Sequence, residues 1–358
     1  MNRISSRLCA LALMCFATTA ASHGDPVYDG YDLAPREPGV DVGVQPLGYP
    51  TGLVGAAIGR DRILRRALKT LGHDLRTFAF RRGPDIVERL GGQRLEVGLI
   101  GDMPTITAIA GGDALVAGVV KLSSSSIVSR ETGLVESLRG RRIAYVEGSS
   151  AHHTLLEGLS SAGLSESDVS LVPMGVSDMP AALHAGDISA FAAWEPAPTI
   201  ALSQSADHRI VFRGRSTDYL VLSREFESAH PQAARELIAA LVRAIRWMQL
   251  SRANVEAAAR WTMADGAKLT GHPTDASVAQ AVHITHAELL NVPAVPIIPA
   301  SARGMLGLGG KLSLLQRLQK VSKTINNDQI ERAFAFSGLH EVLSDPARYR
   351  LNNFDYDR

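Results

Sequence analysis

Apolar residues along the chain repeat first at strand spacing and then at helix spacing. Residues 40–44 alternate valine with other residues as a strand does, and residues 51–72 place apolar side chains at helical intervals. Thr51 is available as the N-cap of this helix and Gly72 as its stop. The pattern predicts a short strand followed by one helix, with a break near Gly59.

The same alternation continues through two successive stretches of the chain. The first ends at residue 120, and the second begins after the serine run at 123–126. Because strands that alternate with helices pair in parallel, the pattern predicts an α/β fold with two similar lobes. Further strands are expected at 75–80, 95–101, 114–120, near 127, and at 141–148, 169–173, 188–195 and 218–223, and further helices at 84–92 and 104–112, from 134 and 149, and at 179–185.

The pattern changes to longer helices after residue 226. Residues 231–263 read as one long helical segment in which Leu237, Leu241 and Ile245 recur at four-residue steps. We expect these helices to pack onto the first lobe. Residues 326–358 are more polar, and their pattern assigns no element.

The first 22 residues have the order of a secretory signal peptide. Two arginines precede an apolar run at 8–17, which is too short to span a bilayer, and small residues follow it. Both cysteines, Cys9 and Cys15, lie in this segment, and Met14 before Cys15 argues against a lipoprotein. We therefore expect a periplasmic protein whose mature chain has no disulfide and no thiolate ligand.

The charge balance excludes a strongly charged partner. The 358 residues hold 37 basic and 36 acidic side chains, and removal of residues 1–22 leaves 35 against 36. A nearly neutral chain lacks the excess of basic residues that binds nucleic acid, so we expect no nucleic-acid partner. With 46% hydrophobic residues the chain can bury a sizeable core.

The junction at residues 145–159, "YVEGSSAHHTLLEGL", is the first candidate site. A serine nucleophile elbow needs a second glycine that residues 148–152 lack. A metal site is the second interpretation, because His153 and Glu157 lie one helical turn apart. His152 points to another face of the helix, and His23 is a lone residue near the N-terminus, so the set of metal ligands is incomplete. We expect no metal and no cofactor.

An anion seat is the third interpretation of this junction. Gly148 permits a tight turn, Ser149 or Ser150 caps the helix, and the free N–H groups of its first turn point outward. Such a seat binds sulfonate, nitrate, phosphate or carboxylate. The alternative that the serines merely cap a helix stays open.

Three other loops follow strands in the same way. Gly101 and Asp102 precede a helix that begins near Pro104, and Tyr49 and Thr51 follow the first strand. Ligands bind at this edge of open parallel sheets, so the loops predict one cleft.

The third of these loops holds Trp194 and Glu195. Trp194 is either a core aromatic or a ligand wall, and Glu195 and Asp102 are helix caps, hinge partners or acceptors for an amine. Four arginines are further candidates for reaching an anion: Arg81, Arg82, Arg213 and Arg215.

These residues resemble the periplasmic solute-binding proteins of the nitrate, sulfonate and taurine ABC importers, over about residues 40–260. The resemblance is greatest at 134–196, "LVESLRGRRIAYVEGSSAHHTLLEGLSSAGLSESDVSLVPMGVSDMPAALHAGDISAFAAWEP". The upstream segment "LEVGLIGDMPTITAIAGG" is also similar to the family. Arg141 and Arg142 replace the usual lysines, Asp187 lacks the usual following alanine, and the tail beyond Lys311 is unlike the family.

The resemblance implies a two-lobed type II periplasmic binding protein fold with a hinged cleft and a helical C-terminal extension. One lobe would hold residues 40–121 and 222–358 and the other residues 122–221, with hinges near 121–126 and 216–223. The implied partners are a small anionic ligand and an inner-membrane ABC permease. The implied ligand contacts are Tyr49, Thr51, Gly101, Asp102, Gly148, Ser149, Ser150, His152 and Trp194.

The sequence therefore predicts a non-enzymatic receptor for a small organic anion, such as an alkanesulfonate, taurine or a related oxyanion. Three alternatives remain. The first is an exported enzyme, either a serine hydrolase or a relative of the thiamine-precursor branch. The others are a binding protein for a neutral heterocycle, and a stand-alone sensor or chaperone that kept the fold and lost transport.

Overall fold

The computed structural model describes residues 25–33, 39–92, 94–131, 133–290, 308–334 and 336–357. Its contacts divide the chain into residues 1–31, which contain the 3₁₀ helix η1 (Pro26–Tyr28), and residues 32–358. The expected signal peptide and His23 lie outside the described residues. Among the described helices, none is both long and apolar enough to cross a membrane.

The first lobe has three parallel strands, β1 (Gly39–Val44), β2 (Asp74–Ala79) and β3 (Val97–Gly101), with β1 in the middle. The valines of β1 are buried, as their alternation predicted. The helices of this lobe are α1 (Thr51–Arg60), α2 (Arg62–Thr70), α3 (Gly83–Gly91) and α4 (Asp102–Ala110).

The expected helix at 51–72 is two helices, and the break lies at Asp61 rather than Gly59. Asp61 is extended at ψ 102° and its carboxylate accepts hydrogen bonds from the amides of Ile63 and Leu64, so it N-caps α2. The N-cap of α1 is Pro50, and Thr51 is the first helical residue. The Thr51 hydroxyl does not cap α1 and can therefore hydrogen-bond to a residue elsewhere in the chain.

The second lobe repeats the parallel arrangement, with β5 pairing with both β6 and β7. The segment expected to be helical from Leu134 forms only a 3₁₀ turn. The elements of this lobe are η2 (Val135–Leu138), β5 (Arg142–Tyr145), α5 (Ser150–Ser161), η3 (Glu166–Asp168), β6 (Ser170–Pro173), α6 (Met179–Ala185), β7 (Ala190–Ala193) and α7 (Ala197–Gln204).

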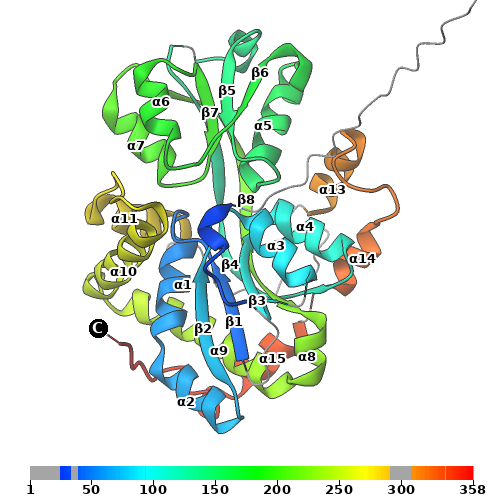
Figure 1. Ribbon diagram of the computed structural model, residues 1–358, viewed down its shortest axis with the longest axis vertical. Coiled ribbons are helices and arrows are strands. Elements are labelled where there is room, and N and C mark those ends of the chain that lie inside the picture. The colour runs from blue at the N-terminus through cyan, green and yellow to red at the C-terminus, as the bar shows by residue number, and fades with distance from the viewer. Residues whose placement is uncertain are drawn as a thin grey trace, which may run out of the picture. The chain divides into compact units, whose positions relative to one another are not determined.

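Two long strands, β4 (Ala114–Ser129) and β8 (Arg209–Ser223), run from one lobe into the other (Figure 1). They are antiparallel to each other and to their other neighbours, so the expectation of parallel pairing is wrong for them. They join all strands into one sheet of order β2-β1-β3-β8-β4-β7-β5-β6.

The serine run at 123–126 is part of β4 and not a loop between two strands. Ser123 pairs with Ser216 of β8 and Ser126 with Arg213, so the main chain is hydrogen-bonded through the run. Small polar side chains are tolerated there because the ladder satisfies the backbone. The two strands expected at 114–120 and near 127 are therefore one.

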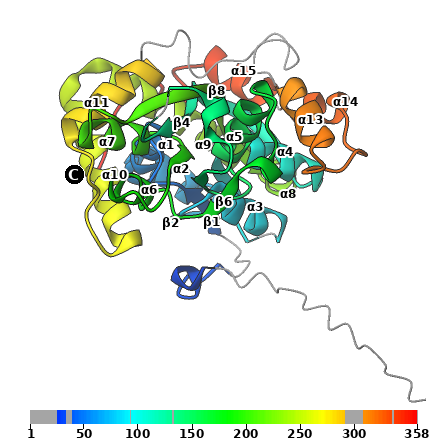
Figure 2. The ribbon, with the colours of Figure 1, turned by 90° about the horizontal axis from the view of Figure 1, so that it is seen from above.

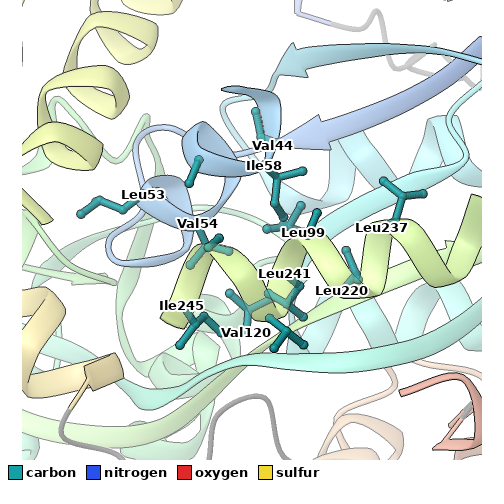
Figure 3. Packing of buried hydrophobic residues seen from close by; sticks show 14 of the residues in the cluster. Val44, Leu53, Val54, Ile58, Leu99, Val120, Leu220, Leu237, Leu241 and Ile245 are labelled. Carbon is teal, nitrogen blue, oxygen red and sulfur yellow. The ribbon is translucent and has the colours of Figure 1, made fainter. Parts of the chain in front are cut away.

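The helices after β8 pack onto the first lobe, as expected (Figure 2). Leu237, Leu241 and Ile245 lie in one apolar core with Val54 of α1 and Leu220 of β8 (Figure 3). The long segment at 231–263 is divided at Ser251, whose hydroxyl caps the second helix. These helices are α8 (Arg224–Ala229), α9 (Pro231–Leu250), α10 (Arg252–Thr270), α11 (Val278–Thr285) and the π-helix η4 (His286–Leu290).

The C-terminal region contains three more described helices, α13 (Leu308–Arg317), α14 (Asn327–Arg332) and α15 (Phe336–Ser344). The segment after α15 returns to α2, where Arg62 pairs with Asp355 and the amide of Arg62 donates to the Asp355 carbonyl. The polar tail that gave no pattern is thus held by ion pairs and by apolar side chains, since Leu339, Val342 and Tyr349 are buried in the same core as the valines of β1.

Candidate anion-binding cleft

A small hollow lies where loops of both lobes meet the crossing strands. The loops follow β1, β3, β5 and β7, which is the sheet edge at which ligands bind in open α/β folds. We call it the hinge pocket. Its lining residues are Gln45, Gly48, Thr51, Gly83, Gly101, Pro104, Lys121, Ser149, Ser150, Trp194, Ser216 and Asp218.

The N-terminus of α5 has the geometry of an anion seat. Gly148 has φ +73°, a left-handed conformation that glycine adopts without strain. Ser149 is the N-cap, and its hydroxyl accepts from the His152 amide and donates to the Val146 carbonyl. Among the described residues the amides of Ser150 and Ala151 have no hydrogen-bond acceptor, as is usual for donors of a first helical turn.

His152 and His153 are both buried beside this turn. The Nδ1 atom of His152 accepts from the Gly148 amide at 3.2 Å, and its Nε2 lies 3.6 Å from Glu166 Oε1, so the ring braces the turn. Burial lowers the pKa of His153 to about 4, with the ammonium of Lys311 adding to the effect, so its ring is neutral near pH 7.

Two opposite charges face each other on the crossing strands. Lys121 of β4 pairs in register with Asp218 of β8, and Lys121 Nζ lies 3.8 Å from Asp218 Oδ2. The Thr51 hydroxyl donates to the same carboxylate oxygen. Burial opposes the charge of Lys121, but the carboxylates of Asp218 and Glu288 outweigh it and raise the pKa of Lys121. Lys121 therefore stays charged at the floor of the pocket.

Glu288 of the π-helix η4 is the second carboxylate beside Lys121. Its Oε2 lies 3.8 Å from Lys121 Nζ. Burial, together with the charges of Glu195 and Asp218, raises the pKa of Glu288 to about 7 against the lowering effects of Lys121 and Ser123. The charge close to Lys121 therefore changes near neutral pH.

Asp102 lies fully buried at the start of α4. Its Oδ1 accepts from the Met103 amide, and its Oδ2 accepts from the Thr217 amide at 3.2 Å and lies 2.6 Å from Lys311 Nζ. Burial opposes the charged form, but the nearby ammonium of Lys311 lowers the pKa of Asp102. Asp102 thus joins α4, β8 and α13 and does not line the hinge pocket.

The two lobes touch at the rim of the pocket. A Cβ on Gly101 of the first lobe would overlap the Ser150 hydroxyl of the second, and a Cβ on Gly48 would lie 3.0 Å from Trp194 Nε1. Trp194 Nε1 donates to the Leu47 carbonyl at 3.3 Å. Because glycine has no side chain, Gly48 and Gly101 let the lobes approach this closely.

Five of the nine residues predicted as ligand contacts line the hinge pocket, and four do not. Tyr49 lines a second, mostly apolar hollow, also walled by both lobes, and burial raises the pKa of Tyr49 to about 12. Asp102 lies behind the pocket, while Gly148 and His152 shape the turn. The five lining residues are Thr51, Gly101, Ser149, Ser150 and Trp194.

The other polar candidates lie elsewhere. Glu195 caps α7, since its carboxylate accepts from the Thr199 amide, and its carbonyl accepts from the Tyr49 amide. Arg82 pairs with Asp85, and Arg213 and Arg215 are exposed. Neither these three arginines nor Arg81 line the hinge pocket. No group of three or more possible metal ligands occurs within the described ranges.

Sequence reasoning missed Lys121 and Asp218, which supply the charges of the pocket. Lys121 interrupts the apolar run "LVAGVVKL", and a lysine in a strand buried on both faces is a signal of a paired or functional charge. Asp218 precedes the apolar run "YLVL" in the same way. Their pairing depends on the antiparallel register of two distant strands, which periodicity does not reveal.

The NMT1-like family model matches residues 63–263, which is more than half of the chain. The chain belongs to the NMT1-like family. Two relatives are each named a putative aliphatic sulfonates-binding protein: one from Escherichia coli (strain K12), 30% identical over 164 residues, and one from Bacillus subtilis (strain 168), 25% identical over 194 residues. The predicted resemblance to sulfonate-binding proteins is therefore confirmed.

The matched segments cover 44% and 51% of this chain, and the chain spans about half the length of these relatives, 51% and 58%. The solved alkanesulfonate-binding protein SsuA from Xanthomonas axonopodis pv. citri, bound to MOPS, is 23% identical with a TM-score of 0.61, over 80% of this chain and 95% of that one. This likeness confirms the predicted fold class of this NMT1-like chain.

Gly101→Ala tests whether the lobes must meet at this rim. Gly101 has φ −75°, which alanine adopts freely, so folding is preserved while the new methyl group meets Ser150. We expect an unchanged melting temperature and a ligand affinity about tenfold lower, measured by calorimetry with the ligand identified below.

The matched control is Gly133→Ala, where an added Cβ has no neighbour within 4 Å. Ser150→Gly in the Gly101→Ala background removes the opposing hydroxyl and should recover part of the lost affinity. Unchanged affinity in Gly101→Ala would show that binding does not require this contact.

Proposed function

We propose that the chain is the periplasmic substrate-binding component of an ABC importer, which captures a small organic anion between its lobes and delivers it to an inner-membrane permease. The anion is an alkanesulfonate, taurine or a related oxyanion. The observation that carries the proposal is the hinge pocket, where the N-terminus of α5 and the ammonium of Lys121 line one hollow. The sulfonate-binding names of its relatives support the ligand class.

An anion in this pocket meets two complementary sources of positive potential. The amides of Ser150 and Ala151 supply fixed donors and the positive end of the helix dipole. Lys121 supplies a full charge that Asp218 and Glu288 only partly balance at 3.8 Å. Hydroxyls of Thr51, Ser149 and Ser216 add neutral polar atoms to the lining.

The organic part of the ligand fits the apolar side of the cleft. Trp194 lines the hinge pocket, and Tyr49 lines the neighbouring hollow together with Leu47, Ile200 and Met263. Both hollows are walled by the loop at 45–49. Apolar walls with a few placed polar groups are typical of small-molecule sites.

The side-chain geometry favours a receptor over a serine hydrolase. The Ser149 hydroxyl donates to the Val146 carbonyl, and neither ring nitrogen of the nearby His153 has a hydrogen-bond partner among the described residues. The Nδ1 of His152 is occupied by the Gly148 amide. A nucleophile that lacks a hydrogen-bonded base is not activated.

A ligand panel in thermal-shift and calorimetric experiments tests the proposed function. Ethanesulfonate, hexanesulfonate and taurine should stabilise the protein and be recovered unchanged, whereas a neutral pyrimidine should not bind. Stabilisation by the pyrimidine alone would favour the heterocycle-binding alternative. Turnover of an ester that is lost in Ser149→Ala or Ser150→Ala would instead establish a hydrolase.

The pKa of Glu288 predicts a pH dependence of anion binding. An anion beside Lys121 favours the neutral form of Glu288, so binding takes up a proton and affinity rises as pH falls through about 7. We expect the dissociation constant for hexanesulfonate to fall about threefold from about pH 8 to about pH 6.

Glu288→Gln should remove most of this dependence, because the amide does not titrate. Glu88→Gln, on an exposed side chain of α3, is the matched control and should retain it. An equal pH dependence in wild type and Glu288→Gln would assign the proton to another group.

A further inference from the structure

The described C-terminal residues 308–334, which we call the clasp, lie against both lobes. Helix α13 contacts α4 of the first lobe and α5 of the second, and α14 also contacts α4 (Figures 1 and 2). Leu308, Leu312 and Leu315 of α13 are buried. The clasp is therefore packed in place and is not an exposed appendage.

Lys311 of α13 holds the first lobe to a crossing strand. Its side chain is 7% exposed, and its ammonium lies 2.6 Å from Asp102 Oδ2 and donates to the Arg215 carbonyl of β8. Asp102 also accepts from the Thr217 amide of β8. The start of α4 is thus attached to the strand about which the lobes would move.

Lys320, three residues after the end of α13, reaches the second lobe. Its ammonium donates to Glu166 Oε1 of η3 at 3.0 Å. The other end of the clasp is fixed to the first-lobe end of the sheet, since the Val116 amide of β4 donates to the Ala333 carbonyl at 2.7 Å. One segment therefore spans from the first lobe to the second across the side of the cleft.

We propose that the clasp sets the equilibrium between open and closed cleft, with Lys311 and Lys320 as positioning residues of the binding site. Hinge opening about β4 and β8 would separate the second lobe from the clasp, so the Lys320–Glu166 pair exists only when the cleft is closed. An interaction that is present in only one of two states changes the free-energy difference between them by its own free energy, and so shifts their populations. The inference rests on the proposed function, because it describes closure of the same pocket.

This role differs from ordinary stabilisation of the fold. Lys320 and Glu166 are each about one-third exposed, at 32% and 31%, so their pair adds little to the free energy of unfolding. The same small energy still changes the ratio of closed to open protein several-fold. Charge changes at this pair should therefore alter ligand release and leave the melting temperature nearly unchanged.

The test is a charge-swap cycle with Lys320→Glu, Glu166→Lys and the double variant. Arg317→Glu is the matched control, because Arg317 is exposed at the end of α13, three residues before Lys320, and has no ion pair among the described residues. Two quantities are measured near neutral pH: the radius of gyration of the ligand-free protein by small-angle scattering, and the dissociation rate of hexanesulfonate by stopped flow.

We expect each single reversal to enlarge the ligand-free protein and to raise the dissociation rate about fivefold, and the double variant to return toward wild type. Arg317→Glu should match wild type in both. Unchanged single variants, or a double variant no better than the singles, would overturn the proposal. If wild type does not bind hexanesulfonate, the proposed function fails for this ligand, while the scattering of the ligand-free variants still decides the role of the clasp.

Discussion

The antiparallel pairing of β4 with β8 is the constraint on which the rest of the structure depends. These strands join the two lobes, and their register sets Lys121 opposite Asp218 at the point of crossing. A buried lysine is tolerated only with compensating carboxylates, and removal of one partner would leave an uncompensated charge. The hinge and the charged floor of the pocket are therefore built from the same residues.

The electrostatics of the site follow from this arrangement. Among the described residues no arginine lines the hinge pocket, and their positive potential there comes from one lysine in the sheet and from the N-terminus of α5. Asp218 and Glu288 balance Lys121 without contacting it closely, which leaves the ammonium able to attract a ligand. Lys311 plays the matching role for Asp102, which would otherwise be a buried and unpaired carboxylate beside the pocket.

Much of the fold could be predicted from periodicity, because its helices and parallel strands each have a local apolar pattern. The turn at Gly148 and the cap at Ser149 were also predictable, since both depend on neighbouring residues. The crossing strands could not be predicted, because the serine run in β4 has the local sequence of a loop. Only its pairing with β8, where Ser123 lies opposite Ser216, shows that it is a strand. The helix break was predicted near Gly59, and the carboxylate that caps α2 places it at Asp61.

The charges of the site were missed for the same reason. Lys121, Asp218 and Lys311 are far apart in the sequence, and only tertiary structure brings them to one place. Tyr49 and His152 were expected as ligand contacts from the family resemblance, but His152 Nδ1 accepts from the Gly148 amide and Tyr49 lines the second hollow. The lobe boundaries and the ligand contacts stay predictions until a ligand is bound.

The most direct measurement is a titration of the isotope-labelled protein with hexanesulfonate, followed through the backbone amide resonances of serine and alanine. Hydrogen bonds from Ser150 and Ala151 to the bound sulfonate should give these two amides the largest downfield proton shifts, saturating at the calorimetric stoichiometry. Saturable binding that leaves both amides unshifted would contradict an anion held at the N-terminus of α5.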